Sequence, residues 1–339
     1  MMIPRLESAA HFVILNLMKR REFLKHTAGA AGMLTCFPAT LLGIERDLLP
    51  GPIERRTLGK TGEKLSVIGF GGYVLNLSTP EQARDWVREA FEASVNYFDV
   101  APEYGQAEER MGPALEPYRK KVFLACKTAQ RMNAAALNEL DRSLRRLRTD
   151  HFDLYQLHHV TTLKDVDTIF GEDGAIRAFE AAKQAGKVRF LGFSAHSVEA
   201  AMALMDRFTF DTIMFPVNYA TWYSGNFGPQ VLARAHEKQM GILGLKAMAK
   251  RPWPKDADRS AHPGCWYEPM TDPEEALMGL RFTLSHPVTA ALTPTDEGCL
   301  KLALKLAPKV TPLQSEEVTA IKQKAMITAP LFKYVAGHS

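Results

Sequence analysis

Four polar residues end or closely follow consecutive apolar runs of the sequence, in an order suited to proton transfer. Asp99 and Tyr104 lie in FDVAPEYG (98–105), Lys127 lies in VFLACKT, and His158 ends DLYQLH. A buried ammonium group is costly unless it is paired, so we expect Asp99 to be the partner of Lys127. Together these residue types could deliver a proton to a carbonyl oxygen.

A phenol beside an ammonium group is a candidate general acid. We expect Lys127 to favour the phenolate of Tyr104 and so to lower its pKa toward the working pH, where proton transfer is efficient. His158 would then hydrogen-bond a substrate carbonyl. Taken alone, an Asp, Lys or His at a strand end is a structural cap or an ion-pair partner about as often as it is catalytic. Their joint order on adjacent strands favours catalysis.

The elements that would hold these side chains alternate between apolar, β-rich runs and helical stretches. Short apolar strands separated by helices predict βαβ units and a parallel sheet. Eight such runs in about 250 residues match the size of an α/β fold of the (β/α)8 TIM barrel type, whose sites form at the carboxyl ends of the strands. A doubly wound sheet is the alternative, but GFGG (69–72) is not the G-x-G-x-x-G that it would require. The runs begin near Val67, Tyr97, Val122, Phe152, Val188, Thr212, Gly241 and Thr289.

Two further segments belong to this predicted barrel. RTLGKTGEKLS (56–66) predicts an N-terminal β-hairpin, with its turn at 60–62, that closes the barrel bottom. Residues 248–272, rich in Pro, Trp and charge, predict a long loop after strand 7, and such loops are usually functional or disordered. Thr79, before a proline, predicts a helix N-cap. The arginines between 142 and 148 predict a solvated helix face.

The composition excludes several classes of protein. The chain has 339 residues, of which 46% are hydrophobic and 24% charged, so global disorder is excluded. The net charge is +4 without a basic stripe, which argues against nucleic-acid binding. Four scattered cysteines include no C-x-x-C pair, which argues against zinc, an iron–sulfur cluster or a disulfide scaffold. We therefore expect no metal.

The amino-terminal segment has the features of a targeting signal. Arg20 and Arg21 stand in KRREFLK, and residues 26–44 carry no Asp, Glu, Lys or Arg. Glycines dilute this stretch below the apolar content of a typical membrane-spanning helix. The pattern predicts a twin-arginine export signal, and an amphipathic N-terminal helix is the alternative.

This signal sets the predicted domain boundary. Met18 directly precedes the twin arginines, so residues 1–17 are interpreted as an upstream misreading. We divide the chain into 1–45, the export signal and upstream extension, and 46–339, the barrel. The expected location is exported, either periplasmic or membrane-associated through an uncleaved signal, and the twin-arginine export machinery is the expected partner.

Several strings of the chain carry a family resemblance. They are FDVAPEYG, VFLACKT, LDRSLRRLRTDHFDLYQLH (140–158) and GKVRFLGFSAH (186–196). Through them, residues 55 to about 325 resemble the aldo-keto reductases. The resemblance implies a (β/α)8 barrel that binds NADPH, with NADH as the alternative, without a Rossmann fold. It also implies a catalytic tetrad, which falls on Asp99, Tyr104, Lys127 and His158.

The resemblance also implies the cofactor contacts. Ser194 stands where the family holds the nicotinamide carboxamide. Pro216 stands where the family usually has a glutamine, and Asn218 would supply the missing amide contact. Lys246 would meet the pyrophosphate, or be a solvated lysine at a strand end. The full set of expected cofactor residues is Gly71, Gly72, Asp99, Ser194, Asn218 and Lys246.

Other residues near the predicted strand ends have two interpretations each. His159 follows His158 on a strand, so it should point away from the site and be structural. Trp222 and Tyr223 would form a wall of the substrate site or cover the edge of the core. The tryptophans of the long loop, Trp253 and Trp266, have the same two interpretations.

The leading functional interpretation is an NAD(P)H-dependent oxidoreductase. It would reduce aldehyde or ketone carbonyls, or oxidise the alcohols, by hydride transfer with Tyr104 as the general acid. The alternative is a nicotinamide-binding sensor or regulatory barrel with negligible turnover. The substrate is expected to be a small-molecule carbonyl compound, whose identity depends on variable loops.

Overall fold

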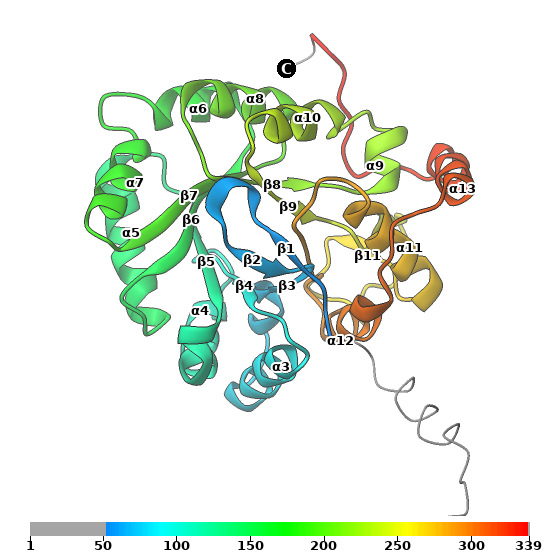
Figure 1. Ribbon diagram of the computed structural model, residues 1–339, viewed down its shortest axis with the longest axis horizontal. Helices are drawn as coiled ribbons and strands as arrows, with labels where there is room; N and C mark the ends of the chain where they lie inside the picture. The colour runs from blue at the N-terminus through cyan, green and yellow to red at the C-terminus, as the bar shows by residue number, and fades with distance from the viewer. Residues whose placement is uncertain (1–51, 338–339) are drawn as a thin grey trace, which may run out of the picture. The chain divides into compact units, whose positions relative to one another are not determined.

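A computed structural model describes residues 52–337 of the chain, so the predicted export signal and the boundary at residue 45 lie outside the described residues. Eight parallel strands form a closed barrel: β3 (Ile68–Gly71), β4 (Tyr97–Asp99), β5 (Phe123–Thr128), β6 (Phe152–Val160), β7 (Val188–Ala195), β8 (Thr212–Pro216), β9 (Gly241–Leu245) and β12 (Ala290–Leu292). Their order around the barrel is β12-β3-β4-β5-β6-β7-β8-β9 (Figure 1). The predicted fold is confirmed, and each strand begins within one residue of its predicted start.

Helices surround the barrel and bury their apolar faces against it (Figure 1). Thr79 caps the first of them as predicted: its hydroxyl accepts from the Gln82 amide at 3.2 Å, and the Gln82 side chain accepts from the Thr79 amide at 2.8 Å. The α-helices are α3 (Pro80–Glu92), α4 (Ala107–Leu115), α5 (Asn133–Arg146), α6 (Leu163–Ile169), α7 (Ala175–Gln184), α8 (Val198–Arg207), α9 (Tyr219–Tyr223), α10 (Pro229–Glu237), α11 (Pro273–Leu284), α12 (Glu297–Leu306) and α13 (Ser315–Met326). Short 3-10 turns are η1 (Gly59–Thr61), η2 (Gly72–Leu75), η3 (Glu116–Lys121) and η4 (Ala307–Lys309).

The arginines of α5 are more than a solvated face. Arg146 pairs with the fully buried Glu108 of α4 at 3.1 Å, and the Glu108 carboxylate also accepts from the Cys126 thiol at 3.6 Å. Arg148 pairs with Glu116 at 3.2 Å. The Arg146 contact joins α5 to α4, whereas Arg148, just after α5, forms an exposed pair, so the predicted solvated face is only partly correct.

The predicted hairpin closes the bottom of the barrel. Strands β1 (Arg55–Thr57) and β2 (Lys64–Ser66) pair antiparallel, and Gly62 takes the left-handed conformation, with φ of 80°, in their connection. Leu58 and Leu65 are fully buried and pack among the side chains that fill the barrel interior. The hairpin is therefore an apolar plug at the amino ends of the strands, and the front of Figure 1 shows it.

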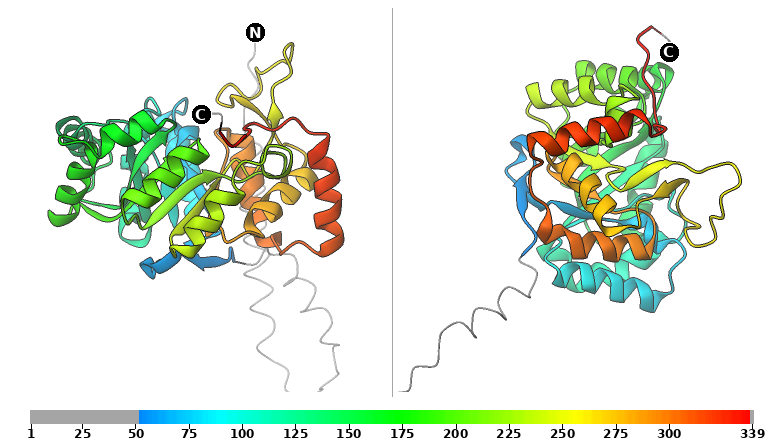
Figure 2. Two further views of the ribbon diagram at one scale, coloured as in Figure 1. Left: turned by 90° about the horizontal axis from the view of Figure 1, so that it is seen from above. Right: turned by 90° about the vertical axis from the view of Figure 1, so that its right-hand side faces the viewer.

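The opposite end of the barrel carries the long loop predicted after strand 7. Its base is a two-stranded ribbon of β10 (Ala249–Pro252) and β11 (Tyr267–Pro269). The loop is closed on itself by the Trp253 indole, which donates to the Cys265 carbonyl at 2.8 Å. The C-terminal segment crosses the same end, where the Tyr334 amide donates to the Gly225 carbonyl at 2.8 Å. Figure 2 shows the ribbon and this segment on the side away from the hairpin.

None of the described helices is both long enough and apolar enough to span a membrane.

Candidate active site

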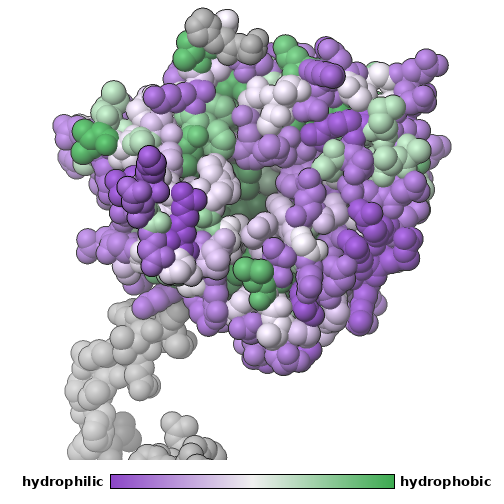
Figure 3. Space-filling view, turned by 180° about the vertical axis from the view of Figure 1, so that it is seen from behind, coloured by the Kyte–Doolittle hydropathy of each residue, from purple (hydrophilic) through white to green (hydrophobic). Residues whose placement is uncertain are grey.

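A cavity of about 650 Å³ opens at the carboxyl ends of the strands, which is the end where barrel enzymes carry their sites. Figure 3 shows this face, with an apolar hollow near its centre and polar side chains around it. The loop between β10 and β11 and the C-terminal segment contribute to the wall. The lining residues include Tyr73, Tyr104, His158, His159, Ser194, His196, Lys246, Arg259, Trp266 and Phe332.

The floor beneath this cavity is a buried ion pair. The Lys127 ammonium donates to Asp99, as predicted, and to the Val100 carbonyl at 3.2 Å. Both side chains are almost completely buried. The Asp99 carboxylate also accepts from the Tyr97 hydroxyl at 3.2 Å and from the Gln156 amide at 3.1 Å. Asp99 is thus fully engaged below the cavity and does not line it.

Two of these partners were not predicted. Tyr97 lies two residues before Asp99, and Gln156 lies two residues before His158. Side chains two apart on a strand face the same side, so period-two spacing along β4 and β6 is the signal that could have found them.

Tyr104 lies above this ion pair and lines the cavity. The Lys127 ammonium is 5.2 Å from the centre of the Tyr104 ring, and the Tyr73 ring packs against the same ring at 5.2 Å. Burial raises the pKa of Tyr104, and the nearby Lys127 charge lowers it without cancelling the effect of burial. The predicted net lowering of this pKa is therefore wrong: the structure keeps the phenol protonated.

His158 lies beside Tyr104, with ring centres 5.6 Å apart in an edge-to-face arrangement. Its Nδ1 is hydrogen-bonded to the Glu103 carboxylate, a partner that was not predicted. Burial lowers the pKa of His158, although the Glu103 hydrogen bond opposes this effect. The structure therefore brings Asp99, Tyr104, Lys127 and His158 together, with Glu103 as an added neighbour.

His159 does not point away from the site as predicted. The pairing of β6 with β7 shifts register between Leu157 and Val160, and His159 has a positive φ of 52°. This bulge breaks the strand alternation, so His159 lines the cavity next to His158. The His159 amide donates to the Ser194 hydroxyl at 2.8 Å.

Lys246 lines the cavity just after β9 and has the features of a residue that binds an anion. Its ammonium lies 4.9 Å from the Trp266 ring centre and 4.7 Å from the Tyr267 ring centre. Among residues 52–337 this ammonium has no carboxylate partner, and burial lowers its pKa to about 8. Its backbone φ of 68° is unusual for a residue other than glycine, and such strain often occurs at functional positions.

Four predicted cofactor residues have other roles in the structure: Asp99, as described above, and Asn218, Gly71 and Gly72. Both polar groups of the Asn218 side chain are used by the backbone: its oxygen caps α9, and its nitrogen donates to the Ala249 carbonyl. Asn218 does not line the cavity, so this prediction is corrected. Gly71 and Gly72 also do not line it. A Cβ on Gly71 would lie 2.5 Å from the Thr293 carbonyl oxygen, and one on Gly72 would lie 2.6 Å from that of Asp99, so these glycines allow close strand packing.

Some of the predicted aromatic residues form a wall of the cavity, and others cover the edge of the core. Trp266 lines the cavity and is 53% exposed. Trp222 instead packs on His286 at 4.1 Å, and both Trp222 and Tyr223 pack on Phe282, so this pair covers the core edge. Phe332 was not predicted, because no local pattern connects the C-terminal segment with the cavity. Its ring lies 5.4 Å from that of His196 and 5.9 Å from that of Trp266.

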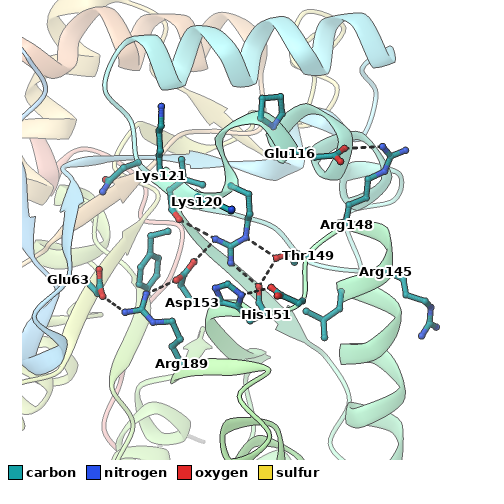
Figure 4. A pocket seen from close by; sticks show the side chains of 17 residues that line it. Glu63, Glu116, Lys120, Lys121, Arg145, Arg148, Thr149, His151, Asp153 and Arg189 are labelled. Atoms are coloured by element: carbon teal, nitrogen blue, oxygen red, sulfur yellow. Dashed lines mark hydrogen bonds and ion pairs between the residues drawn. The ribbon is translucent and has the colours of Figure 1, made fainter.

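A larger cavity, of about 1440 Å³, lies near the amino ends of β4, β5 and β6. Figure 4 shows Glu63 and Asp153 pointing toward Arg189, and Glu116 pointing toward Arg148. Asp153 accepts from Arg119 at 3.0 Å and from Arg189 at 2.7 Å, and its carboxylate also accepts from the Leu124 amide at 2.9 Å. These contacts join the strand ends to each other, so this cavity is structural in character.

One group of potential metal ligands occurs within the described part of the chain. His262, Asp296 and Cys299 each place a donor atom within 4.8 Å of the others. Asp296 accepts from the Cys299 amide at 3.0 Å as the cap of α12, and its second oxygen lies 3.2 Å from His262 Nδ1. These contacts explain the grouping without an ion, and the absence of a metal stays a prediction.

Comparison with known sequences decides the family. Residues 67–264 match the aldo/keto reductase family. The chain belongs to the aldo/keto reductases. The match covers more than half of the chain, from the first barrel strand into the loop between β10 and β11, and it includes all four residues of the predicted tetrad.

Curated relatives of this aldo/keto reductase share about 30% of their aligned residues with it. L-galactose dehydrogenase of Arabidopsis thaliana is 32% identical over 186 residues, which cover 49% of this chain and 56% of the relative. L-glyceraldehyde 3-phosphate reductase of Escherichia coli K12 is 28% identical over 179 residues, covering 46% of this chain and 49% of the relative. The chain thus spans about half the length of the curated relatives it matches.

Solved structures share the fold. An aldo-keto reductase from Bacillus halodurans, in its holo form, superimposes with a TM-score of 0.66 at 24% identity, covering 85% of this chain and all of the other. An aldo-keto reductase from Klebsiella pneumoniae in complex with NADPH has a TM-score of 0.63 at 19% identity, covering 83% and 98%. At these identities the similarity establishes the barrel.

Proposed function

We propose that this aldo/keto reductase catalyses NAD(P)H-dependent reduction of an aldehyde or ketone, or the reverse oxidation of the alcohol. The observation that carries the proposal is the position of the Tyr104 phenol in the cavity, above the buried ion pair of Lys127 and Asp99. A protonated phenol at the edge of a cavity, with a fixed cation beneath it, suits donation of a proton to a developing alkoxide.

Each residue of the site has a defined part in this proposal. Tyr104 gives its hydroxyl proton to the carbonyl oxygen, and the Lys127 charge stabilises the phenolate that results. Asp99 holds the ammonium in place, because its carboxylate is itself fixed by Tyr97 and Gln156. His158 orients the carbonyl from the side of the cavity. The nicotinamide cofactor, when bound, supplies the hydride.

The cavity suits a nicotinamide cofactor. Its volume of about 650 Å³ lies in the range of small-molecule and cofactor sites. Lys246 offers the positive charge of a half-buried ammonium group to a phosphate group, and Arg259 adds a second cation from the long loop. Ser194 lines the cavity and offers a hydroxyl to an amide. We propose NADPH as the cofactor, with NADH as the alternative.

Nucleotide titration and turnover together test this function. Trp266 lines the cavity, so NADPH should quench the tryptophan fluorescence of the purified protein in a saturable way, and Trp266→Phe should remove most of the change. Reduction of 4-nitrobenzaldehyde or a quinone should be visible as loss of NADPH absorbance. Saturable binding with no turnover of any carbonyl would favour the sensor alternative. No response to either NADPH or NADH would refute both.

We further propose that the protein is exported through the twin-arginine route and acts in the periplasm or at the membrane. The support is the KRREFLK string around Arg20 and Arg21 and the uncharged, glycine-containing stretch that follows it. This route carries folded proteins, which suits a barrel that must bind its cofactor.

A further inference from the structure

We propose that Glu103 is a positioning residue that fixes the tautomer of His158, so that His158 can donate a hydrogen bond to a carbonyl only as an imidazolium ion. The inference rests on the proposed function for its catalytic consequence. It makes His158 a protonation-dependent element of the site: an acceptor when neutral and a donor when charged.

The geometry supplies the first step. Glu103 directly precedes Tyr104 in the connection between β4 and α4, and its carboxylate contacts Nδ1 of His158. A carboxylate can only accept, so the hydrogen must lie on Nδ1. A neutral imidazole has one N–H, which leaves Nε2 with a lone pair and no hydrogen. In this state the free nitrogen of His158 cannot donate to a carbonyl oxygen.

The charged groups around His158 set the second step. Glu103 favours the imidazolium, and so does the more distant Asp99, whereas Lys127 disfavours it. Arg131, from the segment after β5, donates to the His158 carbonyl at 2.9 Å and adds a further positive charge. The remaining titratable neighbours are Tyr104 from the β4–α4 connection, His159 from β6 and His196 just after β7.

The balance of these effects defines the ground state. Burial lowers the pKa of His158, and the hydrogen bond with His158 lowers the pKa of Glu103. At neutral pH the pair is therefore a carboxylate and a neutral imidazole. Uptake of one proton from solvent at Nε2 converts it to a carboxylate and an imidazolium, and no other bond changes.

The two forms suit opposite directions of the reaction. Neutral His158 accepts a hydrogen bond at Nε2, as an alcohol would offer. Protonated His158 donates one, as a carbonyl would need. Carbonyl binding should therefore tighten, and reduction should accelerate, as the pH falls through the pKa of His158. Removing the Glu103 charge should displace this dependence to lower pH.

The tautomer itself is the most direct test, because it needs no activity. In 15N-histidine-labelled protein near pH 8, long-range 1H–15N spectra distinguish Nδ1–H from Nε2–H, and His158→Ala identifies the signals. We expect Nδ1–H in the parent protein and Nε2–H in Glu103→Leu, which has no acceptor. Finding Nε2–H in the parent would overturn the proposal, whatever the function of the protein.

The pH profile tests the catalytic consequence. Glu103→Gln keeps the shape of the side chain and removes its charge, so the pH above which kcat/KM for carbonyl reduction declines should move about 1–2 pH units lower. The change should lie in the KM for the carbonyl, while NADPH binding by fluorescence stays within about twofold. Glu103→Asp should restore part of the parent profile.

Glu172→Gln is the matched control, since it removes an exposed carboxylate far along the sequence and should leave the profile unchanged. An unshifted decline of kcat/KM at higher pH in Glu103→Gln would contradict the proposed role even if the enzyme is active. Absence of activity in the parent would contradict the proposed function instead, and the tautomer experiment would still decide the position of the hydrogen.

Discussion

Tyr104 experiences two opposing influences, and their balance determines what it can do. Burial favours the neutral phenol, and the Lys127 ammonium favours the phenolate. The neutral form prevails in the free protein, so the proton is present before the carbonyl arrives. The ammonium then matters most when the proton leaves, because it stabilises charge that develops only during the reaction.

Tyr104→Phe should remove the proton donor and little else. The ring and its packing against Tyr73 remain, so the melting temperature and NADPH binding should be close to those of the parent. Loss of a positioned general acid typically lowers the rate by about 10²–10⁴-fold. Steady-state carbonyl reduction measures it, with Tyr73→Phe as a control that removes a phenol from the same cavity. A Tyr104→Phe enzyme with more than about a third of the parent rate would show that another group donates the proton.

Lys127→Met should damage both activity and stability. Asp99 would keep its hydrogen bonds to Tyr97 and Gln156 but lose the charge that compensates its burial, which typically costs about 3 kcal/mol or more. Denaturant unfolding should report this loss, and Lys164→Met, on the exposed side of α6, should show none. An unchanged midpoint in Lys127→Met would mean that the ion pair contributes no net stability.

Lys246 should couple cofactor binding to pH. Its pKa is lowered to about 8, against an ordinary value of 10.5, so between these pH values the unfolded chain holds more protons than the folded one. The free energy of unfolding should therefore rise with pH across this window, whereas NADPH affinity should fall as the ammonium loses its charge. Thermal melts and fluorescence titrations at pH 7, 8 and 9 measure the two trends.

Lys246→Met separates these effects. It should raise the melting temperature at pH 7, by about 2–4 °C for each kcal/mol of burial penalty removed, while weakening NADPH binding. It should also abolish both pH trends. A variant that melts lower and binds NADPH as the parent does would contradict the assigned role.

Three of the four tetrad residues found from the sequence are each defined by their own strand, and Tyr104 follows one of these strands closely. Asp99, Lys127 and His158 end apolar runs, so the register of a parallel barrel brings them to one end. Glu103 could not be paired with His158 in this way, because they lie 55 positions apart and meet through a loop. Phe332 and Arg259 reach the cavity from segments with no periodic pattern.

At the scale of elements, strand alternation decides which predictions hold. It correctly gives one face of β4, β5 and β6 to the site, and it fails at the bulge near the end of β6. There the extra residue and the positive φ of His159 rotate a second histidine into the cavity. The bulge depends on how β6 pairs with β7, and the sequence HHV contains no glycine that would have predicted it.

The amino ends of the strands depend on Asp153, which is 4% exposed and accepts from two arginines and a backbone amide. Asp153→Ala should leave Arg119 and Arg189 without their shared partner and destabilise the fold by about 3 kcal/mol. The site lies at the other end, so kcat and KM of the folded enzyme should change by less than about twofold. Asp150→Ala, which removes an exposed carboxylate of the same cavity, is the control for chemical denaturation. Equal stability of the two variants would refute this account.

At the scale of the whole molecule, the barrel, its hairpin and its long loop were predictable because strand spacing and turn residues are local signals. The proposed export signal rests on the amino-terminal sequence and needs its own test. Replacing Arg20 and Arg21 with lysine keeps the charge but should retain the protein in the cytoplasm, as measured by cell fractionation. Unaltered export of the double variant would exclude the twin-arginine route. A variant with only one of the two arginines replaced is the control and should retain part of the export.

The apolar plug formed by Leu58 and Leu65 has a consequence for how this lineage can change over time. With the network around Asp153 it stabilises the amino ends of the strands, whereas part of the cavity wall at the other end comes from loops. We expect substitutions at exposed positions of the segment between β10 and β11, such as Trp266, to change the cavity at less cost to folding than substitutions in the plug. New substrates can be explored at that end while inheritance preserves the barrel.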